Sequence, residues 1–205
     1  MKLLAQHSPA FEPSRPWQQL ASRQAGESRL FRQMALLRRS PHGNVEHEFT
    51  RLDCPEWVNV IAFREAALGG ELLVVEQFRH GIDRATLEIV GGVCEPGEDP
   101  AHAASRELRE ETGHREGRLV PLGSCAPNPA VQNNRCHFFL ALDCRPEGPL
   151  QLDASEELRL WAVSWPEWEA RLRSGEIDHA LVLAAFLRLR LWEGWDKLEE
   201  TLSRP

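Results

Sequence analysis

The sequence predicts an α/β protein, and three observations support this fold class. Runs of apolar and β-branched residues that are typical of strands recur between residues 30 and 163. One helix near the middle of the chain has sequence signals at both ends, and further helical segments follow toward the C-terminus. A chain of 205 residues with 42% hydrophobic and 27% charged residues is long enough for one domain with an extension, and its composition argues against disorder.

The N-terminal region is predicted to be a β-hairpin that follows an arm. Residues 1–24 are polar and interrupted by proline, so we expect an arm that packs on another part of the protein. Residues 30–37 are strand-like, and residues 45–52 alternate apolar and polar side chains. The turn between them falls on His42-Gly43-Asn44. We therefore treat residues 1–55 as an N-terminal region and residues 56–205 as the main domain.

The main domain is predicted to alternate strands with a few helices. Asp99 is a typical N-cap, Pro100 suits the first helical position, and Gly113 suits a left-handed C-cap, so a helix is expected to end at Thr112. Further helices are expected over 165–174 and 178–192. Strands are expected over residues 57–63, 72–78, 86–90, 136–142 and 158–163.

Charge and cysteine usage exclude several classes of protein. A net charge of −7 and a pI near 5.7 argue against nucleic-acid binding, which normally requires a basic surface. No segment approaches the ~18 apolar residues of a membrane span, and the N-terminus lacks the apolar stretch of a signal peptide. The five cysteines are dispersed and never spaced C-x-x-C, which favours reduced thiols and offers no zinc site. We expect a cytoplasmic protein.

Three carboxylates share one face of the predicted central helix. At about 100° per residue, Glu107, Glu110 and Glu111 fall within roughly a third of the circumference, with Cβ atoms about 5–6 Å apart. Such crowding is unfavourable unless pKa values rise, counter-charges lie nearby or divalent cations bind, and carboxylate oxygens suit Mg²⁺ or Mn²⁺. A pair between Arg106 and either Glu98 or Glu110 would hold the acidic face in position.

The spacing of these residues resembles the Nudix box of the Nudix hydrolase family, and it reads Gly92-x5-Glu98-x7-Arg106-Glu107-Leu108-x-Glu110-Glu111-x-Gly113. By chance, the pattern would occur in a chain of this length with a probability on the order of one in 10⁵. The one departure is His114 at the last apolar position of the box, which we expect to loosen packing after the helix. The resemblance implies an α/β/α sandwich with a mixed sheet.

Further segments resemble the branch of pyrophosphatases that act on ADP-ribose and nucleoside diphosphate sugars. These segments are residues 76–79, 86–92, 95–98 and 174–180. The resemblance implies hydrolysis of a nucleoside diphosphate linked to another group, with Mg²⁺, or alternatively Mn²⁺, as cofactor. Another Nudix substrate, such as a dinucleoside polyphosphate, NADH or coenzyme A, is an alternative, as is a nucleotide-sensing module without turnover.

The resemblance also implies roles for residues in the box. Glu107 and Glu111 are the leading metal ligands, and the Gly91 carbonyl is an additional ligand by its position in the family. Glu110 is a third ligand or a base, or else only a partner of Arg106. Gly92, Glu98, Arg106 and Gly113 are structural members of the motif.

Outside the box, the resemblance implies a catalytic base on a later loop. Glu156 is the first candidate and Glu157 the second, and the alternative for both is a solvated loop acid. In the resembling branch, the N-terminal region commonly builds a homodimer. The alternative is that this region extends its own sheet within a monomer.

Three residues are candidates for contact with the substrate. Arg79 is a candidate for diphosphate binding, because a guanidinium matches phosphate oxygens in a fork; the alternative is a surface arginine at a strand end. Trp57 either stacks on the base or packs in the core. Glu88 either meets the substrate or its metal waters, or pairs with an arginine.

Overall fold

The computed structural model describes residues 15–43, 45–64, 70–152 and 157–203. The chain divides into two compact units, Met1–Asp53 and Cys54–Pro205. None of the described helices is both long and apolar enough to span a membrane.

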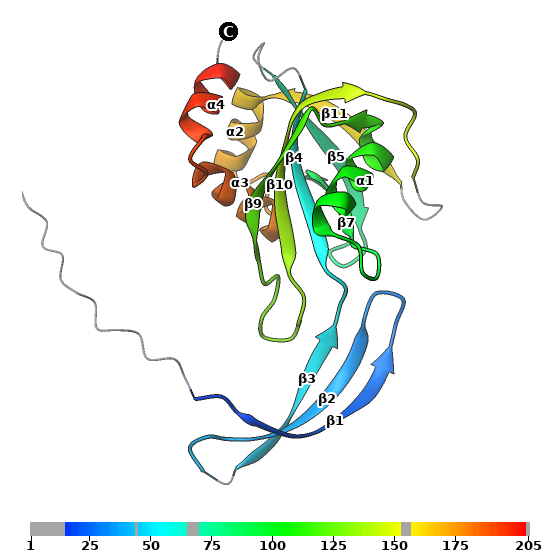
Figure 1. The fold of residues 1–205 in the computed structure, drawn as a ribbon, viewed down its shortest axis with the longest axis vertical. Helices are drawn as coiled ribbons and strands as arrows, with labels where there is room; N and C mark the ends of the chain where they lie inside the picture. The colour runs from blue at the N-terminus through cyan, green and yellow to red at the C-terminus, as the bar shows by residue number, and fades with distance from the viewer. Residues whose placement is uncertain (1–14, 44, 65–69, 153–156, 204–205) are drawn as a thin grey trace, which may run out of the picture. The chain divides into compact units, whose positions relative to one another are not determined.

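The N-terminal unit is a three-stranded antiparallel sheet with β2 in the centre (Figure 1). Its strands are β1 (Gln18–Glu27), β2 (Arg32–Arg39) and β3 (Glu46–Asp53). Ala35 and Leu36 of the central strand are buried. The predicted hairpin is confirmed, because Arg39 lies opposite Glu46 at its closed end. Asn44 of the predicted turn lies outside the described residues.

Strand β1 corrects the expectation of an arm over residues 1–24. Residues 18–24 pair with β2, although nearly every side chain of β1 is exposed or polar. Because β1 is an edge strand whose place is set by backbone hydrogen bonds, its sequence carries no alternation of apolar and polar residues. Residues 1–14 of the expected arm lie outside the described part of the chain.

The C-terminal unit contains a mixed sheet, as predicted. Strands β4 and β10 pair in parallel, and the other described pairs of this sheet are antiparallel. The central order is β11-β5-β4-β10-β8, while β6 pairs with β5, β7 with β4, and β9 with β10. The strands are β4 (Trp57–Arg64), β5 (Glu71–Arg79), β6 (Arg84–Glu88), β7 (Val90–Val93), β8 (His114–Arg115), β9 (Arg118–Cys125), β10 (Cys136–Pro146) and β11 (Leu158–Ser164).

Helices cover both faces of this sheet, which confirms the α/β/α sandwich (Figure 1). They are α1 (Pro100–Thr112), α2 (Trp165–Ser174), α3 (Ala180–Arg190) and α4 (Trp195–Leu202). On one face, Leu108 of α1 packs with Val60 of β4 in one apolar cluster. On the other face, Trp168 of α2 and Leu189 of α3 pack with Phe138 of β10 in a second cluster.

Helix α1 begins and ends at the predicted residues. The Asp99 carboxylate accepts a hydrogen bond from the Ala101 N–H at 2.8 Å, and Pro100 occupies the first turn. Gly113 has a φ of 66° and donates its N–H to the Arg109 carbonyl at 2.8 Å. A Cβ at Gly113 would also lie 2.3 Å from the Gly148 carbonyl oxygen, so this position requires glycine.

His114, which the sequence was expected to place loosely after α1, contacts the end of the helix. His114 is buried and its N–H donates to the Thr112 hydroxyl at 3.1 Å. Its ring nitrogen Nδ1 lies 2.7 Å from the Thr112 carbonyl oxygen. The imidazole therefore contacts the end of the helix through Nδ1, while its buried Nε2 has no hydrogen-bond partner among the described residues.

Candidate functional site

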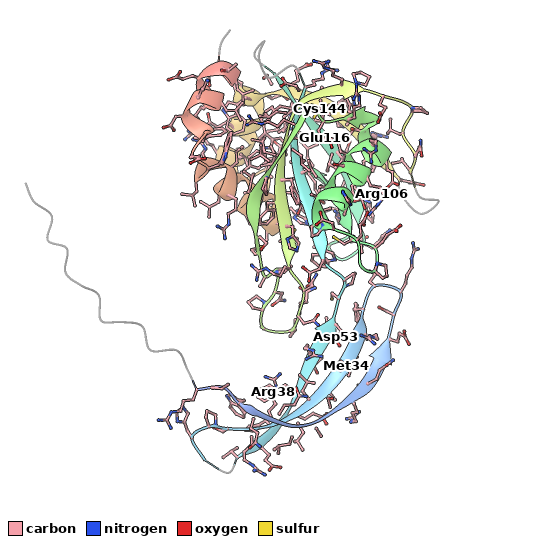
Figure 2. All side chains as sticks on the ribbon, in the orientation of Figure 1. Met34, Arg38, Asp53, Arg106, Glu116 and Cys144 are labelled. Atoms are coloured by element: carbon pink, nitrogen blue, oxygen red, sulfur yellow. The ribbon has the colours of Figure 1, made fainter. Side chains whose placement is uncertain are left out.

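Arg106 links the loop before α1 to two acidic residues of the helix. It projects from the middle of α1 (Figure 2) and forms a two-pronged pair with Glu98, whose oxygens lie 3.1 and 3.0 Å from Nε and Nη2. Its Nη1 donates to Glu107 at 2.8 Å and to Glu110 at 2.9 Å. Its Nη2 also donates to the Val93 carbonyl at 3.0 Å. Both pairs considered from the sequence, with Glu98 and with Glu110, are formed.

These contacts fix the charge states of Glu98 and Arg106. Hydrogen bonding to Arg106 lowers the pKa of Glu98, with a further contribution from the Glu95 N–H. The hydrogen bonds of Arg106 to Glu98 outweigh burial and raise the pKa of the guanidinium. Glu98 is therefore a permanent anion and Arg106 a permanent cation at neutral pH.

The carboxylate of Glu107 lies against Gly92 of β7, in space that a side chain at this position would occupy. A Cβ built on Gly92 would lie 2.2 Å from Cδ and Oε1 of Glu107. Glu107 is 8% exposed, and burying a carboxylate is costly unless it meets counter-charges or a cation. The absence of a side chain at Gly92 thus makes the room in which this carboxylate sits beside the strand.

Glu111 lies one turn further along α1 and contacts the neighbouring glycine. The Gly91 N–H donates to Oε2 of Glu111 at 3.2 Å, and Glu111 is 4% exposed. Gly91 is also closely packed against β4, because a Cβ there would lie 2.3 Å from Nδ2 of Asn59 and 2.7 Å from the Val58 carbonyl oxygen. The two buried carboxylates of α1 therefore face adjacent residues of β7.

Glu110 differs from these two acids. Its side chain is 37% exposed, and its contact with Nη1 of Arg106 is an i,i+4 ion pair. This exposure leaves Glu110 closer to solvent than Glu107 and Glu111.

Arg79 and Glu88 form a second group on β5 and β6. The Arg79 guanidinium makes two hydrogen bonds of 2.7 Å to the Glu88 carboxylate. The Glu88 side chain is 2% exposed and that of Arg79 is 43% exposed. The Thr86 hydroxyl donates to Glu88 at 2.5 Å, and Nε2 of His179 lies 3.7 Å away. Burial opposes ionisation of Glu88, but Arg79, Thr86 and His179 outweigh it and lower the pKa.

The remaining candidates are Trp57, Glu157 and Glu156. Trp57 begins β4 and is half-buried against the apolar cluster beneath α2 and α3, which is the packing arrangement considered from the sequence. Glu157 is exposed just before β11. Glu156 lies outside the described residues.

Sequence reasoning missed Asn59 and Thr86. Asn59 interrupts the otherwise apolar run of β4 and is 8% exposed, and a polar residue buried in a central strand is the signal that could have identified it. Thr86 is ordinary in a strand, so nothing in the sequence set it apart from other strand threonines.

The donor set of the box suits a hard divalent cation. Glu107, Glu111 and the Gly91 carbonyl supply only oxygen atoms, which Mg²⁺ and Mn²⁺ prefer. The two carboxylates are already buried beside a strand whose glycines leave room for them. Within the described ranges, no three Asp, Glu, His or Cys side chains converge into a ready-made metal cluster. The residues present therefore fit a bound Mg²⁺ or Mn²⁺ ion as oxygen donors.

A mixed sheet between helices, with an acidic helix facing a Gly-Gly strand, defines the Nudix hydrolases, enzymes that hydrolyse pyrophosphate bonds. The NUDIX domain model matches residues 55–186, and this chain belongs to that family.

Individual relatives and a solved structure are also similar to this chain. The ADP-ribose pyrophosphatase of Bacillus subtilis (strain 168) is 31% identical over 125 residues, which are 60% of this chain and 68% of that protein. The ADP compounds hydrolase NudE of Escherichia coli (strain K12) is 27% identical over 59% of this chain and 64% of that protein. A crystal structure of an ADP compounds hydrolase shares the fold, with a TM-score of 0.76, 22% identity, and coverage of 88% of this chain and 96% of that one.

Proposed function

We propose that this chain is a Mg²⁺-dependent pyrophosphohydrolase of ADP-ribose and related ADP-linked compounds, yielding a nucleoside monophosphate and a sugar phosphate. The observation that carries the proposal is the placement of the Glu107 and Glu111 carboxylates, both buried, against Gly92 and Gly91. The relatives described as an ADP-ribose pyrophosphatase and an ADP compounds hydrolase support the substrate class.

In this proposal, Glu107, Glu111 and the Gly91 carbonyl hold the cation, with Mn²⁺ as an alternative to Mg²⁺. When bound, such a cation neutralises the diphosphate and lowers the pKa of a coordinated water. Arg106 orients Glu107 through its 2.8 Å contact and is itself fixed by Glu98. The arginine thereby keeps one ligand aimed before the substrate arrives.

Arg79 is proposed to bind the diphosphate. Glu88 occupies Nε and Nη2 of its guanidinium, which fixes the plane of the group at the end of β5. A guanidinium oriented in this way loses less rotamer entropy when an anion binds. Glu88 then acts on the substrate through Arg79. Trp57 is proposed to contact the nucleobase with the edge that its packing leaves exposed.

We assign activation of the attacking water to Glu156, with Glu157 as the second candidate and Glu110 as the third. Glu157 is exposed just before β11 and is accessible to water. Glu110 projects from the same helix as the proposed ligands but is engaged by Arg106.

The location and the oligomeric state of the protein are also proposals. We propose a cytoplasmic homodimer in which residues 1–55 contribute to the interface between subunits and residues 56–205 carry the hydrolase. The edge strand β1 supports this, because its exposed backbone edge offers hydrogen-bonding groups to a second chain. The five cysteines are free thiols, as is usual in a reducing compartment.

The test is a substrate panel with Mg²⁺, in which products are resolved by chromatography. The panel contains ADP-ribose, other nucleoside diphosphate sugars, a dinucleoside polyphosphate, NADH and coenzyme A. We expect the parent protein to release AMP and ribose 5-phosphate from ADP-ribose. Glu111→Gln should show no turnover. The matched control Glu200→Gln, which changes an exposed acid on α4, should show full turnover. Preference for another member would replace the substrate class, and nucleotide binding without any turnover would indicate a sensing module.

A further inference from the structure

Two cysteines lie directly opposite each other on the hairpin formed by β9 and β10. Cys125, the last residue of β9, and Cys136, the first residue of β10, are cross-strand partners. Opposite residues of an antiparallel pair have Cα atoms about 4.5–5.5 Å apart, and a disulfide requires about 4.4–6.8 Å. The backbone of the hairpin therefore already has the spacing that a bond between the two sulfur atoms needs.

The two side chains also point to the same side of the sheet. Cys136 is fully buried in the apolar cluster beneath α2 and α3, and Cys125 packs against that same cluster. Directly opposite residues of an antiparallel pair project to one face, so the two thiols are neighbours. Both are free cysteines.

The thiol of Cys136 is connected to the candidate metal site through one residue. Its Sγ donates to Oδ1 of Asn59 at 3.1 Å. Nδ2 of the same amide lies where a Cβ of Gly91 would be, and the Gly91 N–H binds Glu111. A change at the sulfur thus reaches the proposed cation ligands through a single amide side chain.

We propose that Cys125 and Cys136 form a reversible intrachain disulfide that switches this site according to the thiol redox state. The effect on the site, though not the disulfide, rests on the proposed function. The oxidant is a low-molecular-weight disulfide such as glutathione disulfide. A deprotonated cysteine attacks it, forming a mixed disulfide and releasing one glutathione thiolate. The second cysteine, once deprotonated, attacks the protein sulfur of that mixed disulfide and releases the second glutathione.

The surroundings of the two thiols set the order of these steps. Burial raises the pKa of Cys125, but the guanidinium groups of Arg135 and Arg188 oppose that shift, and Cys125 is half-buried. Burial raises the pKa of Cys136 to about 12, and no cation opposes it. Cys125 is therefore the thiol that meets the oxidant first, and Cys136 resolves the mixed disulfide. Because the thiolate is the nucleophile, oxidation accelerates as the pH rises from 7 to 9.

Formation of the bond removes the S–H group that donates to Asn59. The Asn59 carbonyl oxygen then loses its donor in a buried position, which favours reorientation of the amide beneath Gly91. Reduction restores the thiol and the original contact. Oxidation is expected to lower turnover by about 2- to 30-fold, the range typical of coupling through a packed network.

The first experiment maps the bond without relying on activity. The folded protein is incubated with glutathione disulfide, alkylated, digested without reductant and analysed by mass spectrometry. We expect a peptide pair joined through Cys125 and Cys136, no such pair in Cys125→Ser or Cys136→Ala, and an unchanged pair in the control Cys54→Ser. Glutathione adducts on single cysteines, with no joined pair in the parent protein, would overturn the proposal.

The second experiment measures the effect on the site. Turnover of ADP-ribose is compared in the reduced, oxidised and re-reduced parent protein and in Cys125→Ser. We expect a reversible loss in the parent and none in Cys125→Ser. A joined pair with unchanged turnover would refute the switch. If the reduced parent turns over no nucleotide, the proposed function fails, whereas the mapping experiment still decides whether the disulfide forms.

Discussion

Replacing Gly92 by alanine inserts a methyl group into the space that the Glu107 carboxylate occupies. The new Cβ would lie 2.2 Å from Cδ and Oε1 and 2.5 Å from Oε2 of Glu107. Ordinary contacts between such atoms are about 3.5–4.0 Å, so the carboxylate must move by about 1.3 Å or more. The atoms displaced are the far end of a flexible side chain, which can rotate away while the backbone of β7 stays in place.

The structure therefore predicts a large loss of activity with a small change in stability. A displacement of about 1 Å in a catalytic constellation typically lowers the rate by about 10²-fold. A glycine replaced by alanine at a compatible backbone conformation gains about 0.4–1 kcal/mol through the unfolded state, which offsets part of the cost of moving Glu107. We expect the free energy of unfolding to change by less than about 1 kcal/mol.

The assay compares kcat/KM for ADP-ribose with Mg²⁺ and measures chemical denaturation of the same preparations. The control is Gly81→Ala, where an added Cβ meets no atom within 4 Å, so activity should match the parent and the free energy of unfolding should be equal or higher by up to about 1 kcal/mol. A Gly92→Ala variant that folds normally and keeps the parental kcat/KM would refute the placement of Glu107 in the site.

Three further predictions concern the second group and the base. Glu88→Gln should lower the free energy of unfolding by about 1–3 kcal/mol at pH 7, because it removes a buried charged partner of Arg79. Arg79, Thr86 and His179 outweigh burial and hold the pKa of Glu88 below 4.5. The stabilisation is therefore present above pH 4.5 and is lost as the pH falls through the lowered pKa. A difference in the free energy of unfolding between variant and parent that persists unchanged at about pH 3 would contradict this prediction. Arg79→Ala should raise KM with kcat nearly kept if the guanidinium binds ground and transition states alike, whereas unchanged steady-state constants would make it a surface residue. Glu156→Gln should lower kcat by about 10²- to 10⁴-fold without weakening nucleotide binding; the same phenotype in Glu157→Gln instead would move the base by one residue, and full activity in both would favour Glu110.

Much of the fold could be predicted because its signals are local. The ends of α1 follow from Asp99, Pro100 and Gly113, whose side chains or backbone conformations act within one turn of the helix. Most of β4 and the first half of β5 are buried on both faces and therefore appear as largely apolar runs in the sequence.

The elements that were missed depend on tertiary contacts. Strand β9 contains Pro121, which normally argues against a strand, but Pro121 lies opposite Phe139 at an irregularity in the ladder with β10. The predicted helix over 178–192 is α3, which ends at Arg190, and α4 follows separately. The boundary could not be located from the sequence because apolar residues continue through Leu191 and Trp192.

The candidate site likewise combines features that the sequence predicts with features that depend on tertiary contacts. The carboxylates of α1 could be predicted from their spacing, because a helix converts spacing into a shared face. The contact of Asn59 with Gly91 and the opposition of Cys125 to Cys136 could not, because they depend on the registers of β4 with β7 and of β9 with β10. Sequence spacing alone does not specify which residues of distant strands lie opposite each other.

The central claim is that Glu107 and Glu111 hold a divalent cation, and binding of Mn²⁺ tests it most directly. Electron paramagnetic resonance measures the free Mn²⁺ signal during titration into the parent protein, Glu111→Gln and the control Glu200→Gln, with competition by Mg²⁺. We expect saturable binding to the parent and to Glu200→Gln that Mg²⁺ displaces, and a loss of affinity of about tenfold or more in Glu111→Gln. Equal affinity in all three proteins, or no binding to the parent, would contradict it.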